Sequence, residues 1–244
     1  MPVSDLTAIL LAGGLGTRIR QLHPDLPKPL IPVAGKPFLE WLIQYWQAQG
    51  VRRFVLSTGY RSEAVQQFLD SRSFPNCSAI AVREDEPLGT GGAIRHAVQF
   101  AECSDPFIVA NGDSIAPADL SSVWPALADP SIDGWIVAVE MEDVSRYGSV
   151  DAGPNDELTG FREKVSGQGW INAGIYILKR RLLEMFPKSK PLSMEREVFP
   201  SLLQNGARVK TLRAKVPLLD IGTPESLAIA DDFVRRYLAP PRAG

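Results

Sequence analysis

Cysteine is scarce in this chain of 244 residues, where only Cys77 and Cys103 occur. Neither belongs to a CxxC pattern or to a cluster with metal-ligand spacing, which argues against a disulfide framework and a structural zinc site. Histidine is equally scarce, and His23 and His96 are isolated from each other. The sequence therefore offers no convincing Ser/His or Cys/His arrangement for nucleophilic catalysis.

Long apolar runs and an excess of charge are also lacking. No apolar stretch reaches the roughly 18 residues of a membrane-spanning helix, and no basic segment precedes an apolar one near the first residue. The formal net charge is −2, which predicts no general attraction to nucleic acid or to an anionic membrane. We therefore expect a cytoplasmic enzyme with neither a nucleic-acid nor a membrane partner.

The first half of the chain alternates between strand-like and helix-like segments. Strands are expected at 7–12, 53–57, 79–82 and 106–110, and helices at 37–49, 61–69 and 90–101. Helices that connect successive strands in this way predict crossover units and a mostly parallel sheet. The expected class is α/β, with a Rossmann-like central sheet flanked by helices.

The second half changes character, because its strand-like segments have few helices between them. Strands are expected at 135–141, 148–151, 158–162 and 171–178, and helices at 194–203 and 224–237. These strands predict antiparallel additions to one side of the sheet. Since no repeat, linker or low-complexity segment interrupts the chain, we expect a single domain over residues 1–244.

Glycine is concentrated directly after the first expected strand. Gly13, Gly14 and Gly16 permit a sharp turn whose backbone N–H groups point one way, which makes a concave anion site. Arg18 adds a guanidinium fork suited to phosphate, and Lys28 adds a mobile positive charge. The segment predicts a phosphate-binding loop, and the alternative is an ordinary Gly/Pro surface loop.

Two common phosphate-binding motifs do not fit this loop. The dinucleotide fingerprint GxGxxG needs a glycine where Ile19 stands and a helix directly afterwards. Four prolines follow instead, at positions 24, 27, 29 and 32, and they disfavour such a helix. A P-loop needs GK[ST], whereas this chain has Gly16-Thr17-Arg18. The loop thus favours neither a dehydrogenase nor a P-loop NTPase.

Two aspartates stand next to short apolar strands. Asp113 follows the strand expected at 106–110, and Asp220 precedes a helix that begins at Thr223. Open α/β sheets bind ligands at the carboxyl ends of strands, where a carboxylate can hold Mg²⁺ against phosphate oxygens. The alternatives are an Asx turn at Asp113 and a role in helix entry at Asp220.

The segment LAGGLGTRIRQL, followed by PDLPKPLIPVAGKP, resembles the signature of the sugar-1-phosphate nucleotidyltransferases, also called NDP-sugar pyrophosphorylases. Both parts of the family pattern, GGxGTR and PKP, are intact. Within the family, the segments PDLPKP and EDEPLGTGGA most resemble the D-glycero-D-manno-heptose 1-phosphate guanylyltransferases. The resemblance implies the nucleotide-diphospho-sugar transferase fold and Mg²⁺-dependent nucleotidyl transfer from an NTP to a sugar 1-phosphate, with GTP and manno-heptose 1-phosphate favoured.

Other substrates and roles stay open at this point. Mannose 1-phosphate or glucose 1-phosphate with GTP, UTP or CTP would fit the same signature, and an inactive homologue could act as a regulatory subunit. Such a homologue would be expected to lose charged positions, but all of them are present: Arg18, Lys28, Asp113, Lys164 and Asp220. The residues also leave open whether the protein forms a homodimer.

The resemblance implies roles for individual residues around the nucleotide. The nucleotide contacts are expected at Leu11, Ala12, Gly13, Gly14, Gly16, Thr17, Arg18, Lys28, Glu84, Gly89, Thr90 and Asp113. Either Glu84 or Glu86 could accept hydrogen bonds from the N1–H and N2–H₂ groups of guanine. Asp113 and Asp220 are expected to hold Mg²⁺. The residues expected to act in catalysis are Arg18, Lys28, Asp113 and Lys164.

A second implied site would hold the sugar 1-phosphate. The order EK…NAGIY assigns Glu163 to the sugar hydroxyls, Lys164 to the sugar phosphate and Asn172 to the same site, and Gly148 would let the sugar approach. Neighbouring residues of a strand point to opposite faces, so Glu163 and Lys164 need an irregular backbone to reach one ligand. The alternative is a surface charge pair. Val165 stands where the family often has proline.

Overall fold

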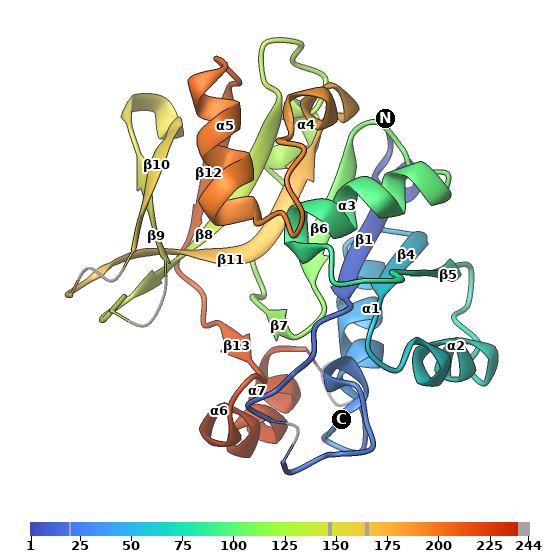
Figure 1. Ribbon diagram of the computed structural model, residues 1–244. Coiled ribbons are helices and arrows are strands. Elements are labelled where there is room, and N and C mark those ends of the chain that lie inside the picture. The colour runs from blue at the N-terminus through green and yellow to red at the C-terminus, as the bar shows by residue number, and fades with distance from the viewer. Residues whose placement is uncertain (20, 146–147, 164–165, 239–244) are drawn as a thin grey trace.

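The computed structural model describes residues 1–19, 21–145, 148–163 and 166–238, and a mixed, mostly parallel nine-stranded sheet forms its centre (Figure 1). The strands are β1 (Thr7–Ala12), β4 (Arg53–Thr58), β5 (Ser78–Arg83), β6 (Phe107–Asn111), β8 (Gly134–Met141), β9 (Gly148–Ala152), β10 (Leu158–Glu163), β11 (Gly169–Leu178) and β12 (Val209–Ala214). Their order is β10-β9-β11-β6-β1-β4-β5, with β8 paired to β11 and β12 paired to β8. The expected α/β class is confirmed.

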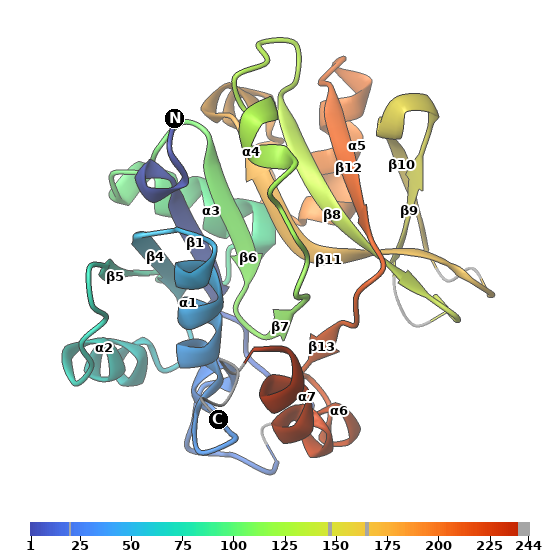
Figure 2. The same cartoon turned by 180° about the vertical axis from the view of Figure 1, so that it is seen from behind.

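The N-terminal half builds the parallel part of the sheet, as the alternating pattern predicts. β1 pairs in parallel with β4 and β6, and β4 pairs in parallel with β5. The crossover helices are α1 (Phe38–Ala48), α2 (Ser62–Asp70) and α3 (Gly89–Phe100). β1 is buried on both faces, because Leu10 packs in the cluster with α1 and α2 whereas Ile9 packs in the cluster with α3. Figure 2 shows α1 on the face of the sheet opposite α3.

The C-terminal half adds the antiparallel strands that the sequence predicts. β11 pairs antiparallel with β6, β8 and β9, and β9 pairs antiparallel with β10. Helix α5 (Phe199–Gln204) packs on the same face as α3, and α4 (Val123–Ala126) packs on the face of α1. β12 was not among the expected strands. It runs parallel to β8, with Val209 opposite Gly134.

One expected helix changes type along its length and another is interrupted, so both differ from the single helices that the sequence predicts. The segment 194–203 begins as a π-helical turn, η5 (Met194–Val198), and continues as α5. Pro200 accounts for the change, because it has no N–H to donate to the Arg196 carbonyl and its ring would clash with that carbonyl in an α-helix. The segment 224–237 forms α6 (Pro224–Ala228) and α7 (Ala230–Tyr237), with Ile229 between them.

Short elements connect these larger ones. They are β2 (Pro32–Val33), β3 (Lys36–Pro37), β7 (Ser114–Ile115), β13 (Leu219–Asp220) and the 3₁₀ helices Val3–Asp5, Lys28–Leu30, Pro154–Asp156 and Arg180–Met185. β7 and β13 pair with each other beside α6 and α7, outside the central sheet (Figure 2). None of the helices in the described part of the chain has the length and apolar character required to cross a membrane.

Candidate functional site

A cavity of about 390 Å³ lies where the glycine-rich loop after β1 meets the turn before α3. This is the carboxyl edge of the parallel strands, where open α/β sheets bind ligands. The cavity is lined by all the residues that the resemblance assigned to the nucleotide: Leu11, Ala12, Gly13, Gly14, Gly16, Thr17, Arg18, Lys28, Glu84, Gly89, Thr90 and Asp113. The fold therefore brings two glycine-rich segments that are far apart in the sequence to one cavity.

Other residues line this cavity that the resemblance did not assign to the nucleotide. They are Leu15, Pro29, Pro87, Leu88, Ala93, Asn111 and Gly222. Asn111 and Gly222 could have been found, because each lies two positions from an aspartate, Asp113 or Asp220, that was already a candidate. Leu15 carried no such signal, and its side chain is 51% exposed at the rim. An apolar residue in a glycine loop predicts no particular contact by itself.

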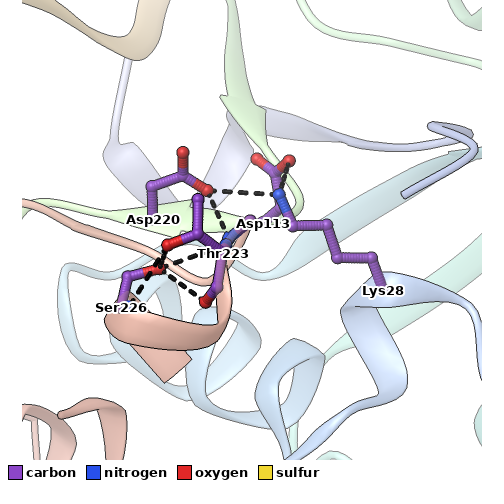
Figure 3. A network of polar contacts seen from close by, with 6 residues as sticks. Lys28, Asp113, Asp220, Thr223 and Ser226 are labelled. Atoms are coloured by element: carbon purple, nitrogen blue, oxygen red, sulfur yellow. Dashed lines mark hydrogen bonds and ion pairs between the residues drawn. The ribbon is translucent and has the colours of Figure 1, made fainter. Parts of the chain in front are cut away.

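The ammonium of Lys28 contacts the carboxylates of both Asp113 and Asp220 (Figure 3), and Lys28 and Asp113 line the cavity whereas Asp220 does not. The Nζ atom of Lys28 is 2.6 Å from Asp113 Oδ2 and 3.1 Å from Asp220 Oδ1. The aspartates meet because β7 pairs with β13, which sets Asp220 opposite Ser114, and because Ile221 N donates to Asp113 O at 2.9 Å. The Lys28 side chain is only 9% exposed. Its charge therefore depends on these two carboxylates for compensation.

The two aspartates have the chemistry of a magnesium site. Both offer hard carboxylate oxygens, both converge on the single cation Lys28, and their side chains are 37% and 31% exposed. In the described ranges of the chain, no three His, Cys, Asp or Glu side chains form a metal-binding group. Mg²⁺ is commonly held by one or two carboxylates together with waters and substrate phosphates. Asp113 and Asp220 therefore fit Mg²⁺ as its protein ligands.

The two acidic residues considered for base recognition have different surroundings. Glu84 lies in the cavity wall, where its Oε1 accepts from Ser57 Oγ at 2.9 Å and its Oε2 accepts from Leu88 N at 3.3 Å. Glu86 is exposed, does not line the cavity, and lies 3.2 Å from Lys190 Nζ. The geometry therefore favours Glu84 over Glu86 as a contact for the base.

The residues expected at the sugar phosphate gather near the start of β11. Gly148 is paired with Glu163 across β9 and β10, and β9 pairs with β11 directly beside Asn172. The backbones of these three residues therefore lie at one corner of the sheet. Lys164, the expected phosphate contact, lies outside the described residues.

β11 also joins this corner to the nucleotide cavity. Gly174 lies where the register of β11 shifts between Asn172 and Tyr176, and its φ of +71° is one that glycine adopts without strain. A Cβ atom at Gly174 would collide with the side-chain amide of Asn111, which lines the cavity. The glycine thus lets the cavity wall pack directly against the strand that carries Asn172.

Comparison with known proteins decides what kind of protein this is. The family model described as Nucleotidyl transferase matches residues 7–236. The chain belongs to the nucleotidyl transferase family. The nucleotidyltransferase activity that the GGxGTR and PKP segments imply, and the resemblance on which it rests, are confirmed by this match.

The nucleotidyltransferase is similar over most of its length to several named proteins. It is 34% identical over 224 residues to a D-glycero-alpha-D-manno-heptose 1-phosphate guanylyltransferase of Campylobacter jejuni, which covers 90% of this chain and 96% of that protein. It is 32% identical over 246 residues to a mannose-1-phosphate guanylyltransferase of Mycobacterium tuberculosis, covering 100% of this chain and 68% of that protein. The crystal structure of HddC from Yersinia pseudotuberculosis complexed with GMP-PN matches with a TM-score of 0.80 and 35% identity, covering 93% of this chain and 99% of that one.

Proposed function

We propose that this nucleotidyltransferase is a sugar-1-phosphate guanylyltransferase that prefers GTP and D-glycero-α-D-manno-heptose 1-phosphate. Two of its relatives are named as guanylyltransferases, one acting on that heptose 1-phosphate and the other on mannose 1-phosphate. A third relative was crystallised with GMP-PN. Guanine is common to all three, which supports GTP as the donor. The cytoplasmic location expected from the sequence stays a prediction.

The position of Glu84 is the observation in this chain that supports GTP as the preferred nucleotide. Its carboxylate is held in the cavity wall by the Ser57 hydroxyl and the Leu88 N–H. Each carboxylate oxygen has a further lone pair, so both can accept additional hydrogen bonds. Guanine presents N1–H and N2–H₂ donors to such an acceptor, whereas adenine lacks that pair of donors. A base without these donors leaves the Glu84 carboxylate desolvated and without a hydrogen-bond partner. The free energy of binding such a base is therefore less favourable, which discriminates against it.

The reaction is an in-line displacement at the α-phosphorus of GTP. An oxygen of the sugar phosphate forms a bond to the α-phosphorus while the bond to the leaving pyrophosphate breaks. Arg18 neutralises the pyrophosphate, Lys28 the α-phosphate and Lys164 the incoming phosphate. Asp113 and Asp220 would hold Mg²⁺, which supplies charge neutralisation at the phosphate oxygens. No protein nucleophile is needed, so positioning and charge neutralisation provide the catalysis.

Mannose 1-phosphate is the second candidate acceptor. The relative named as a mannose-1-phosphate guanylyltransferase is similar along the whole chain, at nearly the same identity as the heptose enzyme. The two sugars share the manno configuration and differ in the length of the exocyclic chain. The choice between them therefore depends on contacts beyond the ring, and only a direct comparison of the two substrates decides it.

The test is a pyrophosphate-release assay with four NTPs against heptose, mannose and glucose 1-phosphates. GTP with the heptose 1-phosphate should give the highest kcat/KM, and Glu84→Gln should reduce the preference for GTP by about tenfold or more, as expected for a lost charged hydrogen bond. Glu86→Gln is the matched control, because its carboxylate faces Lys190 at the surface. A faster reaction with UTP or CTP would refute the guanine proposal. An unchanged base preference in Glu84→Gln would refute only the role of Glu84.

A further inference from the structure

Glu195 lies on the π-helical turn η5 and is not among the residues expected at the nucleotide or at the sugar phosphate. The turn is wide, since Ser193 O accepts from Val198 N at 3.0 Å as well as from Glu197 N at 3.2 Å. Single π-helical turns are rare and are often found at functional sites. The turn places the half-buried Glu195 side chain beside the start of β11.

The Glu195 carboxylate reaches two of the residues expected at the sugar phosphate. Its Oε1 accepts from Asn172 Nδ2 at 2.6 Å. Its Oε2 faces Gly148, where a Cβ atom would lie 3.6 Å from that oxygen. Because Gly148 has no side chain, it places no side-chain atom against the carboxylate. Glu195 therefore belongs to the same corner of the sheet as Gly148 and Asn172.

Both N–H donors of the Asn172 side chain bind groups of the protein. Its Nδ2 atom donates to Glu195 Oε1 at 2.6 Å and to Tyr176 Oη at 2.7 Å, and its Oδ1 accepts from Gly174 N at 2.9 Å. A side-chain amide has only two N–H donors, so both donors of Asn172 are used. Asn172 therefore has no donor left for a sugar hydroxyl, and its contacts instead fix the position of the Glu195 carboxylate.

The segment that carries Glu195 is also bound to the nucleotide turn before α3. Met194 N donates to Thr90 Oγ1 at 2.9 Å, and Thr90 lines the nucleotide cavity. Two residues earlier, Leu192 O accepts from Gly91 N at 2.8 Å and Leu192 N donates to Leu88 O at 2.8 Å. Glu195 is thus held at the boundary between the nucleotide cavity and the corner expected to hold the sugar.

We propose that Glu195 recognises the sugar, accepting hydrogen bonds from hydroxyl groups of the sugar 1-phosphate, and that Asn172 acts as its positioning residue. This inference rests on the proposed function and deepens it. A carboxylate has two oxygens that can accept from neighbouring hydroxyls, and a manno-configured sugar offers such hydroxyls around its ring. Glu195 therefore supplements the role expected of Glu163 and gives the site a second acidic contact for the sugar.

The test compares Glu195→Gln with Glu197→Gln, using GTP with D-glycero-α-D-manno-heptose 1-phosphate and with mannose 1-phosphate. Glu197 is a matched control on the same turn, because its carboxylate accepts from Ser193 N at 2.7 Å and from Ser189 Oγ at 2.9 Å. Glu195→Gln should raise KM for the sugar 1-phosphate by about tenfold or more, the usual effect of losing a charged hydrogen bond. KM for GTP should change by less than about twofold, and Glu197→Gln should leave both constants within that range.

Deoxy analogues of mannose 1-phosphate distinguish a direct contact from a structural effect. For the analogue that lacks the contacted hydroxyl, the ratio of KM between Glu195→Gln and the wild type should fall to about one, because the lost partner is already absent. A residue that only supports the fold would give the same ratio for every analogue. Glu195→Asp keeps the charge on a shorter side chain, so it should bind the sugar phosphate more tightly than Glu195→Gln. It also replaces Glu195→Gln in these measurements if the glutamine variant does not fold.

The outcomes separate this inference from the function on which it rests. A wild-type protein that transfers GMP to none of the sugar 1-phosphates would refute the proposed function and the inference together. An active wild type with an unchanged sugar KM in Glu195→Gln would refute the inference alone. Equal effects of Glu195→Gln and Glu197→Gln, or one constant ratio across all deoxy analogues, would likewise show that the turn has only a structural role.

Discussion

At the scale of single residues, the charges around Lys28 determine what the site can bind. Lys28 is largely buried, whereas Asp113 and Asp220 keep about a third of their side chains exposed. The carboxylates can therefore reach a cation that arrives with the substrate. The flexible side chain of Lys28 also allows its ammonium group to turn toward a phosphate. Removing one carboxylate should affect catalysis more than folding, because each aspartate remains accessible to water.

Asp113→Asn should therefore lower kcat by on the order of 10², as expected when a main electrostatic stabiliser is lost. The melting temperature should stay close to that of the wild type. Steady-state assays with and without EDTA test the same site, and activity should require a divalent cation. Asp119→Asn is the control, because Asp119 is exposed and its carboxylate accepts from Ser121 N at 2.8 Å, in a turn outside the cavity lining. Full activity of Asp113→Asn, or of the wild type in EDTA, would contradict the metal assignment.

At the scale of secondary-structure elements, locally patterned segments are predictable from the sequence. The strand expected at 7–12 matches β1, and the helix expected at 37–49 matches α1 apart from its end residues. Burial on both faces gives β1 a continuous apolar run, and burial on one side gives α1 apolar residues at helical spacing. In both cases the information lies within the segment itself.

Elements that depend on distant partners were missed. β12 has Lys210 and Arg213 among its apolar residues, and it becomes a strand by pairing with β8, which lies far away in the sequence. The π-helical turn before Pro200 depends on where the hydrogen-bonding pattern of the helix changes, which no local sequence pattern indicates. Glu195 was missed for the same reason, since its approach to Asn172 depends on that turn and on the packing of β11. The glycine-rich loop has a local spacing and could be recognised from the sequence, although Leu15 within it was not singled out.

The turn at Gly89 gives a prediction at this scale. Gly89 has a φ of +73°, and a Cβ atom there would lie 2.6 Å from Leu192 O. Gly89→Ala combines the cost of the left-handed conformation with a backbone collision, so it should lower the free energy of unfolding by about 3 kcal/mol. KM for GTP should rise as well, because the turn lines the cavity. Urea unfolding and steady-state kinetics measure the two effects.

Gly206→Ala is the matched control for this turn. Gly206 also has a positive φ, +79°, but a Cβ atom there would have no neighbour within 4 Å. Gly206→Ala should therefore lower the free energy of unfolding by only about 1 kcal/mol, which is the cost of the left-handed conformation alone. Equal losses at the two positions would show that the contact between Gly89 and Leu192 contributes nothing to stability.

At the scale of the whole molecule, β11 joins the parallel and antiparallel halves of the sheet. It pairs with β6 and β9 along one edge and with β8 along the other. Tyr176, near the C-terminal end of this strand, is buried and packs against Phe199 of α5, with ring centroids 5.1 Å apart. Burial raises the pKa of the Tyr176 phenol above its ordinary value of 10.0, and the charge of Glu195 adds to this shift.

The raised pKa predicts a loss of stability at high pH. The unfolded chain releases the phenol proton near pH 10.0, whereas the folded protein keeps it to higher pH. The contribution of Tyr176 is therefore complete below pH 10 and is lost as the pH rises further. Urea midpoints measured at pH 8 and above pH 10 should show this decline, and Tyr176→Phe should reduce it. Tyr237→Phe is the control, because Tyr237 is exposed on α7; an equal change in both variants would contradict the assignment.

The position of Lys28 has a kinetic consequence for substrate loading. The two carboxylates and the ammonium together carry a net charge of −1, so a divalent ion held by Asp113 and Asp220 would have to displace the Lys28 ammonium from them. The displaced ammonium would then need a new counter-ion, which the phosphates of an incoming nucleotide could supply. We therefore expect metal and nucleotide to load as one complex, with the lysine transferred from carboxylate to phosphate in the same step. Free cation alone would have to compete with an internal salt bridge that is already in place.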